Sequence, residues 1–420
     1  LHLVDTYLGV LLRLRRCSVL FDLVFLYREG GEYGKPVRGG IEERIAQRGA
    51  EELAGRTGGV HFVDAARAGE AEATCLLAAA AYLAPRTVSR IAPPLPEYRP
   101  MPLLEVTPPE DTPQGYAVEG GVFSEGSFTV TGRPNLPWCH ILSNHSFGTL
   151  VSDRSLGFTF ADNARENKLT PWYNDTRSDN RGEMLLLRVD GQTYDVCSGA
   201  RATYSSGRAV YEGQAATLSL RLEVSVPAEG CAKRLKLELI QQGEEEKNVE
   251  IAYYTEPVLG VDRRGAARLQ SRWEDGRLFV TNPFQSNFPG SMMLGCDTPG
   301  GRCCCDRSAF LSGRWDEHAL LPLPDPCGSV VVARKLPPHR REKVQFVLSF
   351  GPDEAAARAS GEAVLKGDVG IPENQNSIRI STGDAAIDHM VNTWLPLQFQ
   401  NARLRARTGF YQCSGAWGFR

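Results

Sequence analysis

The stretch LSLRLEVSVPAEGCAKRLKLELIQQGEEEKNVEIAYY, residues 218–254, decides the fold class. Apolar residues alternate with polar ones from Leu218 to Val226, and the alternation returns at 235–239 and again at 249–253. A period of two places one set of side chains on a buried face and the other in water. Three such strands joined by short turns predict an antiparallel meander, and a further strand, Val344–Phe350, is expected beside it. Residues 115–351 are therefore predicted to form a large antiparallel β-sandwich.

The segments on either side of this β-rich region have other patterns. Strand-like FDLVFLY and GVHFVDAA alternate with helix-like IEERIAQRGAEEL and ATCLLAAAAYLA, which predicts a small α/β region over 1–91. A Pro-rich stretch predicts an extended linker over 92–114. An Ala-rich sequence from Asp353 predicts a helical linker over 352–391, with a helix from about Thr382 that Pro396 should interrupt.

Composition favours a folded chain without membrane or nucleic-acid partners. Hydrophobic residues make up 42% and charged residues 23%, and 47 Lys plus Arg against 50 Asp plus Glu give a net charge of -3. No basic footprint suggests nucleic acid. Three arginines interrupt the apolar stretch Leu8–Tyr27, so we expect strands or a buried helix there and no membrane span. Eleven scattered cysteines predict free thiols and a cytoplasmic location.

The run Cys303, Cys304 and Cys305 lacks the two-residue spacing of a zinc site, and we expect no metal there. No Walker loop, GxSxG elbow or HExxH motif is present. His140 and His145 are expected to have structural roles. The absent initiator Met and the ending in mid-pattern lead us to expect a piece of a longer protein.

Residues 137–183 hold the densest set of groups that could bind sugar. Aromatic rings stack on sugar rings, and amides, carboxylates and guanidinium groups bond to hydroxyls. The candidate ligands in this stretch are Arg165, Trp172, Asn174 and Asp175. The alternative is that these side chains satisfy one another in a long loop packed on the sandwich.

The string ENKLTPWYNDTRSDNRGE, 166–183, resembles the sandwich signature of glycoside hydrolase family 94, formerly glycosyltransferase family 36. Further pieces agree in order: EPVLG (256–260), TNPFQSNF (281–288), DRSAFLSGR (306–314), DPCGSVV (325–331) and NTWLPLQFQNARLRARTGFYQCSGAWGFR (392–420). The last is most similar to cyclic β-1,2-glucan synthases and 1,2-β-oligoglucan phosphorylases. The resemblance implies a supersandwich like that of galactose mutarotase, with 392–420 as the truncated start of an (α/α)6 catalytic barrel.

For function, the resemblance implies inverting phosphorolysis of β-linked glucans to α-glucose 1-phosphate. Phosphate is then a co-substrate, no other cofactor is needed, and one carboxylic acid protonates the leaving oxygen. That acid is expected in a Trp-Asn-Asp context, which this sequence lacks, so we name no catalytic residue. Arg420 matches a sugar-binding arginine of the family, and Arg407, Tyr411 and Gln412 lie near it in sequence. Family relatives suggest a homodimer. The alternative is a non-catalytic carbohydrate-binding or scaffolding module of a larger β-glucan synthase.

Overall fold

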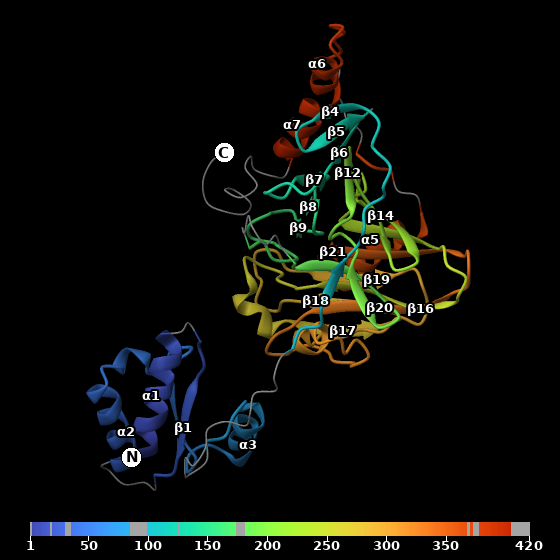
Figure 1. Cartoon of the computed structure of the whole chain (residues 1–420). Coiled ribbons are helices and arrows are strands. Elements are labelled where there is room, and N and C mark those ends of the chain that lie inside the picture. The colour runs from blue at the N-terminus through green and yellow to red at the C-terminus, as the bar shows by residue number, and fades with distance from the viewer. Residues whose placement is uncertain are drawn as a thin grey trace. The chain divides into compact units, whose positions relative to one another are not determined.

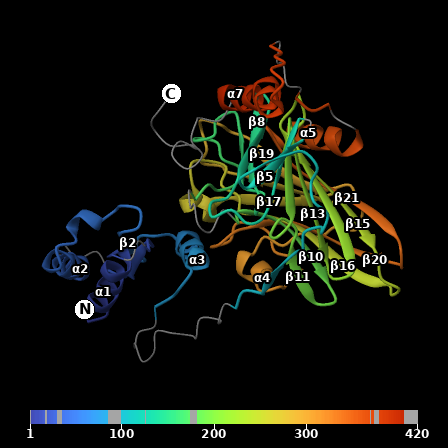
Figure 2. The same cartoon turned by 45° about the horizontal axis from the view of Figure 1, so that its top comes forward.

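The computed structural model of the chain describes residues 2–16, 19–29, 35–84, 99–124, 126–173, 181–367, 370–372 and 378–404. The chain divides into two compact units, Leu1–Glu97 and Tyr98–Arg420 (Figures 1 and 2). Each is described by itself. No helix in the described part of the chain combines the length and the apolar character that crossing a bilayer needs.

The first unit is built on two parallel strands joined through a helix. Its elements are α1 (His2–Arg16), β1 (Leu23–Tyr27), α2 (Pro36–Gln47), η1 (Glu51–Leu53), β2 (Val60–Asp64) and α3 (Glu70–Ala79). Leu23 of β1 pairs with Val60 of β2, and α1 and α2 bury Leu8 and Ile41 in a small core. Both expected strands are confirmed, and the apolar stretch near the start contains a helix followed by a strand.

The second unit contains an antiparallel sheet of eleven strands. In spatial order these are β17 (Gln270–Glu274), β18 (Arg277–Thr281), β19 (Ser291–Cys296), β21 (Arg341–Gly351), β15 (Ala232–Gln241), β14 (Leu218–Ser225), β13 (Arg208–Ala215), β12 (Arg201–Ser205), β6 (Ser127–Val130), β5 (Gly121–Ser124) and β4 (Tyr116–Val118). The expected mainly β architecture is confirmed.

Two smaller sheets face it. The five-stranded sheet has the order β20 (Gly328–Leu336), β16 (Lys247–Thr255), β10 (Glu183–Val189), β11 (Gln192–Asp195), β3 (Leu103–Glu105). The three-stranded sheet has the order β7 (Cys139–Ser143), β8 (Phe147–Ser152), β9 (Phe158–Ala161). Strand β3 lies within the Pro-rich stretch and pairs in parallel with β11 at the sheet edge, a position that proline-flanked strands tolerate.

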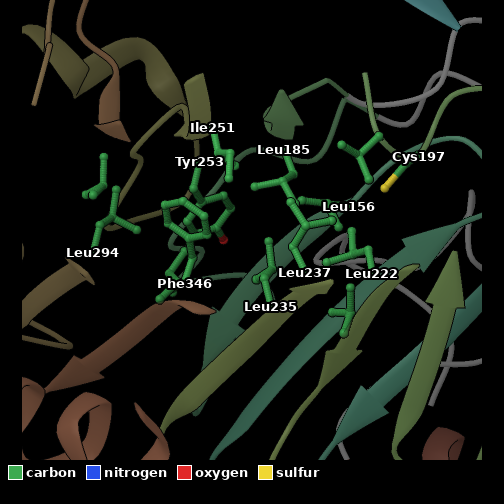
Figure 3. Close-up of a cluster of buried hydrophobic side chains, with 14 of the residues drawn as sticks. Leu156, Leu185, Cys197, Leu222, Leu235, Leu237, Ile251, Tyr253, Leu294 and Phe346 are labelled. Atoms are coloured by element: carbon green, nitrogen blue, oxygen red, sulfur yellow. The ribbon is translucent and has the colours of Figure 1, made fainter. Parts of the chain in front are cut away.

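The main core lies between the eleven-stranded and five-stranded sheets. Figure 3 shows Leu235 and Leu237 of β15 opposite Leu185 of β10, with the Tyr253 ring of β16 beside Phe346 of β21. All five side chains are fully buried. Burial on this scale supplies the main drive for folding, at about 1.5–3 kcal/mol for each large apolar side chain.

The expected meander is wrong at its third strand. Strands β14 and β15 pair as predicted, but β16 lies in the five-stranded sheet and β21 takes the place beside β15. A period of two shows that a strand has one buried face, and both sheets line the same core. The alternation in 249–253 is therefore equally compatible with either sheet, and it does not indicate which strand β16 pairs with.

The Ala-rich sequence predicts a helix, and α5 (Glu354–Lys366) forms there and covers the outer face of the large sheet. The Asp353 carboxylate caps it by accepting from the Ala356 N–H at 2.8 Å. Val364 packs with Met293 and Val347 of the sheet. Gly361 permits this close approach, since an added Cβ would stand 2.2 Å from the Met293 Cε atom.

The expected helix break at Pro396 is also wrong. Segments α6 (Ala385–His389), η3 (Met390–Trp394) and α7 (Leu395–Leu404) follow one another without a gap. Proline lacks an N–H and its ring crowds the carbonyl four residues earlier. The turn before Pro396 is a π-helical one, and a widened turn of this kind lets the helix continue where its hydrogen-bond ladder is interrupted.

One fully buried ion pair connects the three sheets. Lys233 Nζ of β15 lies 2.7 Å from Glu183 Oε2 of β10, and neither side chain is exposed. The ammonium also donates to Thr149 Oγ1 of β8 at 3.0 Å, while Tyr253 and Thr170 donate to Glu183 at 2.9 and 2.6 Å. Burial lowers the pKa of Lys233, with Glu183 opposing the shift.

We expect Lys233→Met to cost about 3–5 kcal/mol of the free energy of unfolding, because it leaves the Glu183 carboxylate buried without its cation. Urea unfolding of the second unit measures this. Lys236→Met, on the same strand at a partly exposed position, is the matched control and should change stability by about 0.5 kcal/mol or less. Adding Glu183→Leu should recover much of the loss. Equal costs for the two lysine variants would contradict the role of the pair.

Candidate functional site: the 162–173 loop and the Glu256 cluster

The 162–173 loop follows β9 and is shaped by Asn163. Its Oδ1 atom accepts from the backbone N–H groups of Arg165 and Glu166 at 2.9 and 3.0 Å. Asp162, just before it, has a φ of 56°, a left-handed conformation that Asp and Asn tolerate best after glycine. The Asp-Asn pair therefore sets the direction in which the chain leaves the strand.

Segments far apart in sequence support this loop. Lys168 and Gly260 exchange backbone hydrogen bonds at 2.9 and 3.1 Å, so the EPVLG segment runs beside the loop. Gln285, from the TNPFQSNF segment, donates through Nε2 to the Glu166 carbonyl at 2.9 Å. Asn282, in the same segment, donates to the Leu259 carbonyl at 2.9 Å. Three of the sequence motifs therefore form one structural support.

The Glu256 cluster brings in one more motif, DRSAFLSGR. The Glu256 carboxylate is 4% exposed, forms an ion pair with Arg263, and accepts from Arg307 Nε at 2.7 Å. It also accepts from the hydroxyls of Tyr173 and Tyr254, at 2.6 and 2.8 Å. We call these five residues the Glu256 cluster.

Asp325, from DPCGSVV, completes the charge balance of the cluster. It lies 3.2 Å from Arg263 and 3.2 Å from Arg307, and its side chain is half exposed. Arg307 opens α4 (Arg307–Leu311), whose cap is Asp306, whereas Arg263 opens the 3-10 helix η2 (Arg263–Arg268). Two short helices thus aim two guanidinium groups at one buried carboxylate.

Charge and burial oppose each other at the Glu256 cluster. Burial disfavours the charged carboxylate, but Arg263, the Tyr173 hydroxyl and Arg307 outweigh it, and the pKa of Glu256 is lowered. Burial and the adjacent Glu256 raise the pKa of Tyr173 to about 12, so its hydroxyl stays protonated and donating. Burial lowers the pKa of the nearby Lys168 to about 8.

Two of the expected sugar ligands lie on this loop. The Arg165 guanidinium is 3.1 Å from Glu166 Oε1, with 24% of its side chain exposed. The Trp172 ring is partly buried against Phe158, with ring centroids 5.2 Å apart, at the edge of a small cluster with Phe160. Asn174 and Asp175 fall within 174–180, outside the described residues. Arg407, Tyr411, Gln412 and Arg420 also lie outside them.

Sequence reasoning missed the Glu256 cluster. Its signal was present, since EPVLG contains one charged residue, Glu256, and the later motifs DRSAFLSGR and DPCGSVV supply Arg307 and Asp325. Their convergence needs the strand pairing of β16 with β20, which brings Thr255 opposite Gly328. The periodicity of apolar residues does not predict the pairing of β16 with β20.

Other groups considered from the sequence are packing elements. Cys303, Cys304 and Cys305 are buried free thiols, and the described part of the chain holds no group of three or more metal-ligating side chains. His140 is fully buried, bonds through Nε2 to the Ser205 carbonyl at 2.9 Å and stacks on Tyr204. Burial lowers its pKa to about 4.

We expect Glu256→Gln to destabilise the second unit by about 3 kcal/mol at pH 7, because two arginines lose their buried counter-charge. The pKa of Glu256 is lower in the folded chain than the ordinary value of about 4.3. Its stabilising effect is therefore complete above about pH 5 and lost as the pH falls through the folded pKa.

Unfolding curves at several pH values test this dependence. The difference in stability between the parent and Glu256→Gln should shrink between pH 5 and pH 3. Asp325→Asn is the matched control, since its half-exposed carboxylate should contribute less than about 1 kcal/mol. A difference that stays constant down to pH 3 would refute the ionic role of Glu256.

Comparisons with known proteins agree with the sandwich architecture. The family model described as glycosyl hydrolase 94, supersandwich domain, matches residues 127–365, more than half of the chain. The cyclic beta-(1,2)-glucan synthase NdvB of Rhizobium meliloti (strain 1021) is 28% identical over 326 residues. That alignment covers 68% of this chain, and the chain spans only 11% of the length of that relative.

Solved structures show weak likeness. A protein described as a kojibiose phosphorylase from the human microbiome has a TM-score of 0.37 at 8% identity, over 59% of this chain and 36% of its own. A bacterial glucoamylase in complex with acarbose has a TM-score of 0.34 at 10% identity, over 57% and 36%. A galactose mutarotase-like protein from Lactobacillus casei ATCC 334 has a TM-score of 0.31 at 9% identity, over 51% and 100%. On the family match over residues 127–365, the chain belongs to glycosyl hydrolase family 94, whose supersandwich domain it carries.

Proposed function

We propose that this chain is the sandwich-bearing portion of an inverting phosphorylase of β-linked glucans. The observation that carries the proposal is the convergence of the family motifs on the 162–173 loop and the Glu256 cluster. In this role the sandwich holds Arg165 and Trp172 for an oligosaccharide. Inorganic phosphate is the co-substrate, and the sugar 1-phosphate is the product. The Trp-Asn-Asp acid is absent from these 420 residues, so the proposal assigns no proton donor among them.

The chemistry of the loop fits a sugar. Trp172 is only partly buried against Phe158, and Tyr173 is 53% exposed while its hydroxyl is fixed on Glu256. Rings of this kind offer C–H surface for stacking. Arg165 offers guanidinium donors for hydroxyl groups.

A scaffolding role is the second candidate, and one observation favours it. The charges of Glu256, Arg263 and Arg307 in the cluster and of Asp325 beside it neutralise one another. Groups satisfied in this way stabilise a loop without contacting a ligand. In that case the sandwich supports a larger β-glucan synthase and binds sugar weakly or not at all.

The 420-residue chain should not release glucose 1-phosphate from any β-linked glucan in the presence of phosphate, because the Trp-Asn-Asp acid is absent from its sequence. The assay is phosphate-dependent formation of the sugar phosphate. A purified phosphorylase of glycosyl hydrolase family 94 that contains this acid is the positive control. Clear turnover by the 420-residue chain would overturn the assignment of the proton donor.

Trp172→Ala separates the two candidate roles. If the ring stacks on sugar, the variant should bind a β-1,2-linked glucan oligosaccharide about tenfold more weakly, as measured by isothermal titration calorimetry. Its melting temperature should fall far less than that of Phe158→Ala, where loss of a buried ring costs about 3–5 kcal/mol. Unchanged affinity with a large fall in melting temperature would establish the scaffolding role.

A further inference from the structure

We propose that the first unit has a binding site for a single sugar ring or a comparable neutral polyol, independent of the function proposed for the sandwich. A cavity of about 310 Å³ opens there at the carboxyl ends of β1 and β2. Its lining includes Tyr27, Glu29, Lys35, Arg38, Asp64 and Arg67. Parallel strands joined through a helix place ligands at this end of the sheet.

Two carboxylates are built into the wall of this cavity. Glu29 follows β1 and is only 8% exposed. Its Oε1 atom accepts from the backbone N–H groups of Val37 and Arg38 at 2.7 and 3.4 Å. Asp64 ends β2, and its Oδ1 atom accepts from the N–H groups of Glu29 and Ala66 at 3.2 and 3.0 Å. Both carboxylates are therefore fixed in orientation by the backbone.

One oxygen of Glu29 remains available. Oε2 accepts no hydrogen bond from the residues that the structure describes, although the side chain is more than nine-tenths buried and lines the cavity. Solvent reaches this oxygen, so a ligand hydroxyl in the cavity could donate to it in place of water. The first requirement on the ligand is therefore an O–H donor.

Two cationic side chains face the same space with different constraints. Arg38 donates to Glu42 Oε1 at 2.8 Å and lies 5.4 Å from the Phe62 ring centroid, with 43% of its side chain exposed. Lys35 has a φ of 39°, strained for a lysine, and forms no ion pair with a described residue. Planar guanidinium donors beside carboxylates that the backbone orients suit a pair of neighbouring hydroxyl groups.

Charge and size restrict the class of ligand further. Three acidic and three basic side chains line the cavity: Glu29, Asp64 and Glu72, with Lys35, Arg38 and Arg67. This balance gives no net attraction for an anion, and a phosphate would meet the free Glu29 oxygen as a like charge. The volume is at the small end for ligand sites, which favours one ring over an oligosaccharide.

Titration calorimetry of D-glucose into the whole 420-residue chain tests this site. Glu29→Gln keeps the size and one acceptor but removes the charge, and it should weaken glucose binding by about tenfold. Lys35→Gly should weaken it several-fold while relieving the strained φ, so the fold is retained. Glu43→Gln, on the exposed side of α2, is the matched control and should bind like the parent.

The outcomes are distinct from those for the sandwich. Trp172→Ala should leave this glucose binding unchanged, whatever it does to oligoglucan binding. If circular dichroism shows that Glu29→Gln unfolds, Lys35→Gly decides. Glucose binding that neither variant weakens, no glucose binding at all, or tighter binding of inorganic phosphate than of glucose would each overturn the proposal.

Discussion

The buried Lys233–Glu183 pair is the interaction on which the second unit depends, because it is shared by all three sheets. Burying either charge alone would cost too much free energy. Lys233 in the eleven-stranded sheet and Glu183 in the five-stranded sheet are tolerated because each neutralises the other. Hydrophobic burial alone would permit the sheets to slide against each other. The pair, with Thr149 and Tyr253 bonded to it, fixes one arrangement of the three sheets. That arrangement in turn positions Thr170, and with it the end of the 162–173 loop.

A second buried carboxylate, Glu256, is also stabilised by cations from other segments of the chain, nearer the surface. Here the counter-charges come from short helices and the bonds from tyrosines, so the cluster connects segments that share no sheet. The two networks meet at adjacent residues of β16. The Tyr253 hydroxyl donates to Glu183, and the Tyr254 hydroxyl donates to Glu256. Neighbouring residues on a strand point to opposite faces. Strand β16 thereby couples the core network on one face to the loop-supporting network on the other.

Local pattern predicted local structure well and partners poorly. The alternation at Leu218–Val226 and the capped, Ala-rich α5 were predictable because each depends on a few consecutive residues. The sheet membership of β16 was not, since alternation is the same for every strand that lines the core. The continuation past Pro396 depends on a widened turn that no composition reveals. Within the site, the ring of Trp172 was identifiable by type, whereas Glu256 became evident only when folding gathered four motifs around it.

The described C-terminal helical run contacts the sandwich through Trp394. Trp394 packs among Phe123, Phe128 and His140, with ring centroids 5.6, 5.7 and 6.0 Å away. These rings come from the β5–β6 edge of the large sheet and from β7, so one tryptophan joins the helix to two sheets. His140 can take part only as a neutral ring, and its burial maintains that state by lowering its pKa to about 4. Ring contacts and the hydrogen bonds of Asn392 with the Ile380 backbone hold this helical run, and β7 leads directly into the β8–β9 hairpin and the 162–173 loop. The sandwich therefore sets the position of its loop and of the following helix through the same few strands.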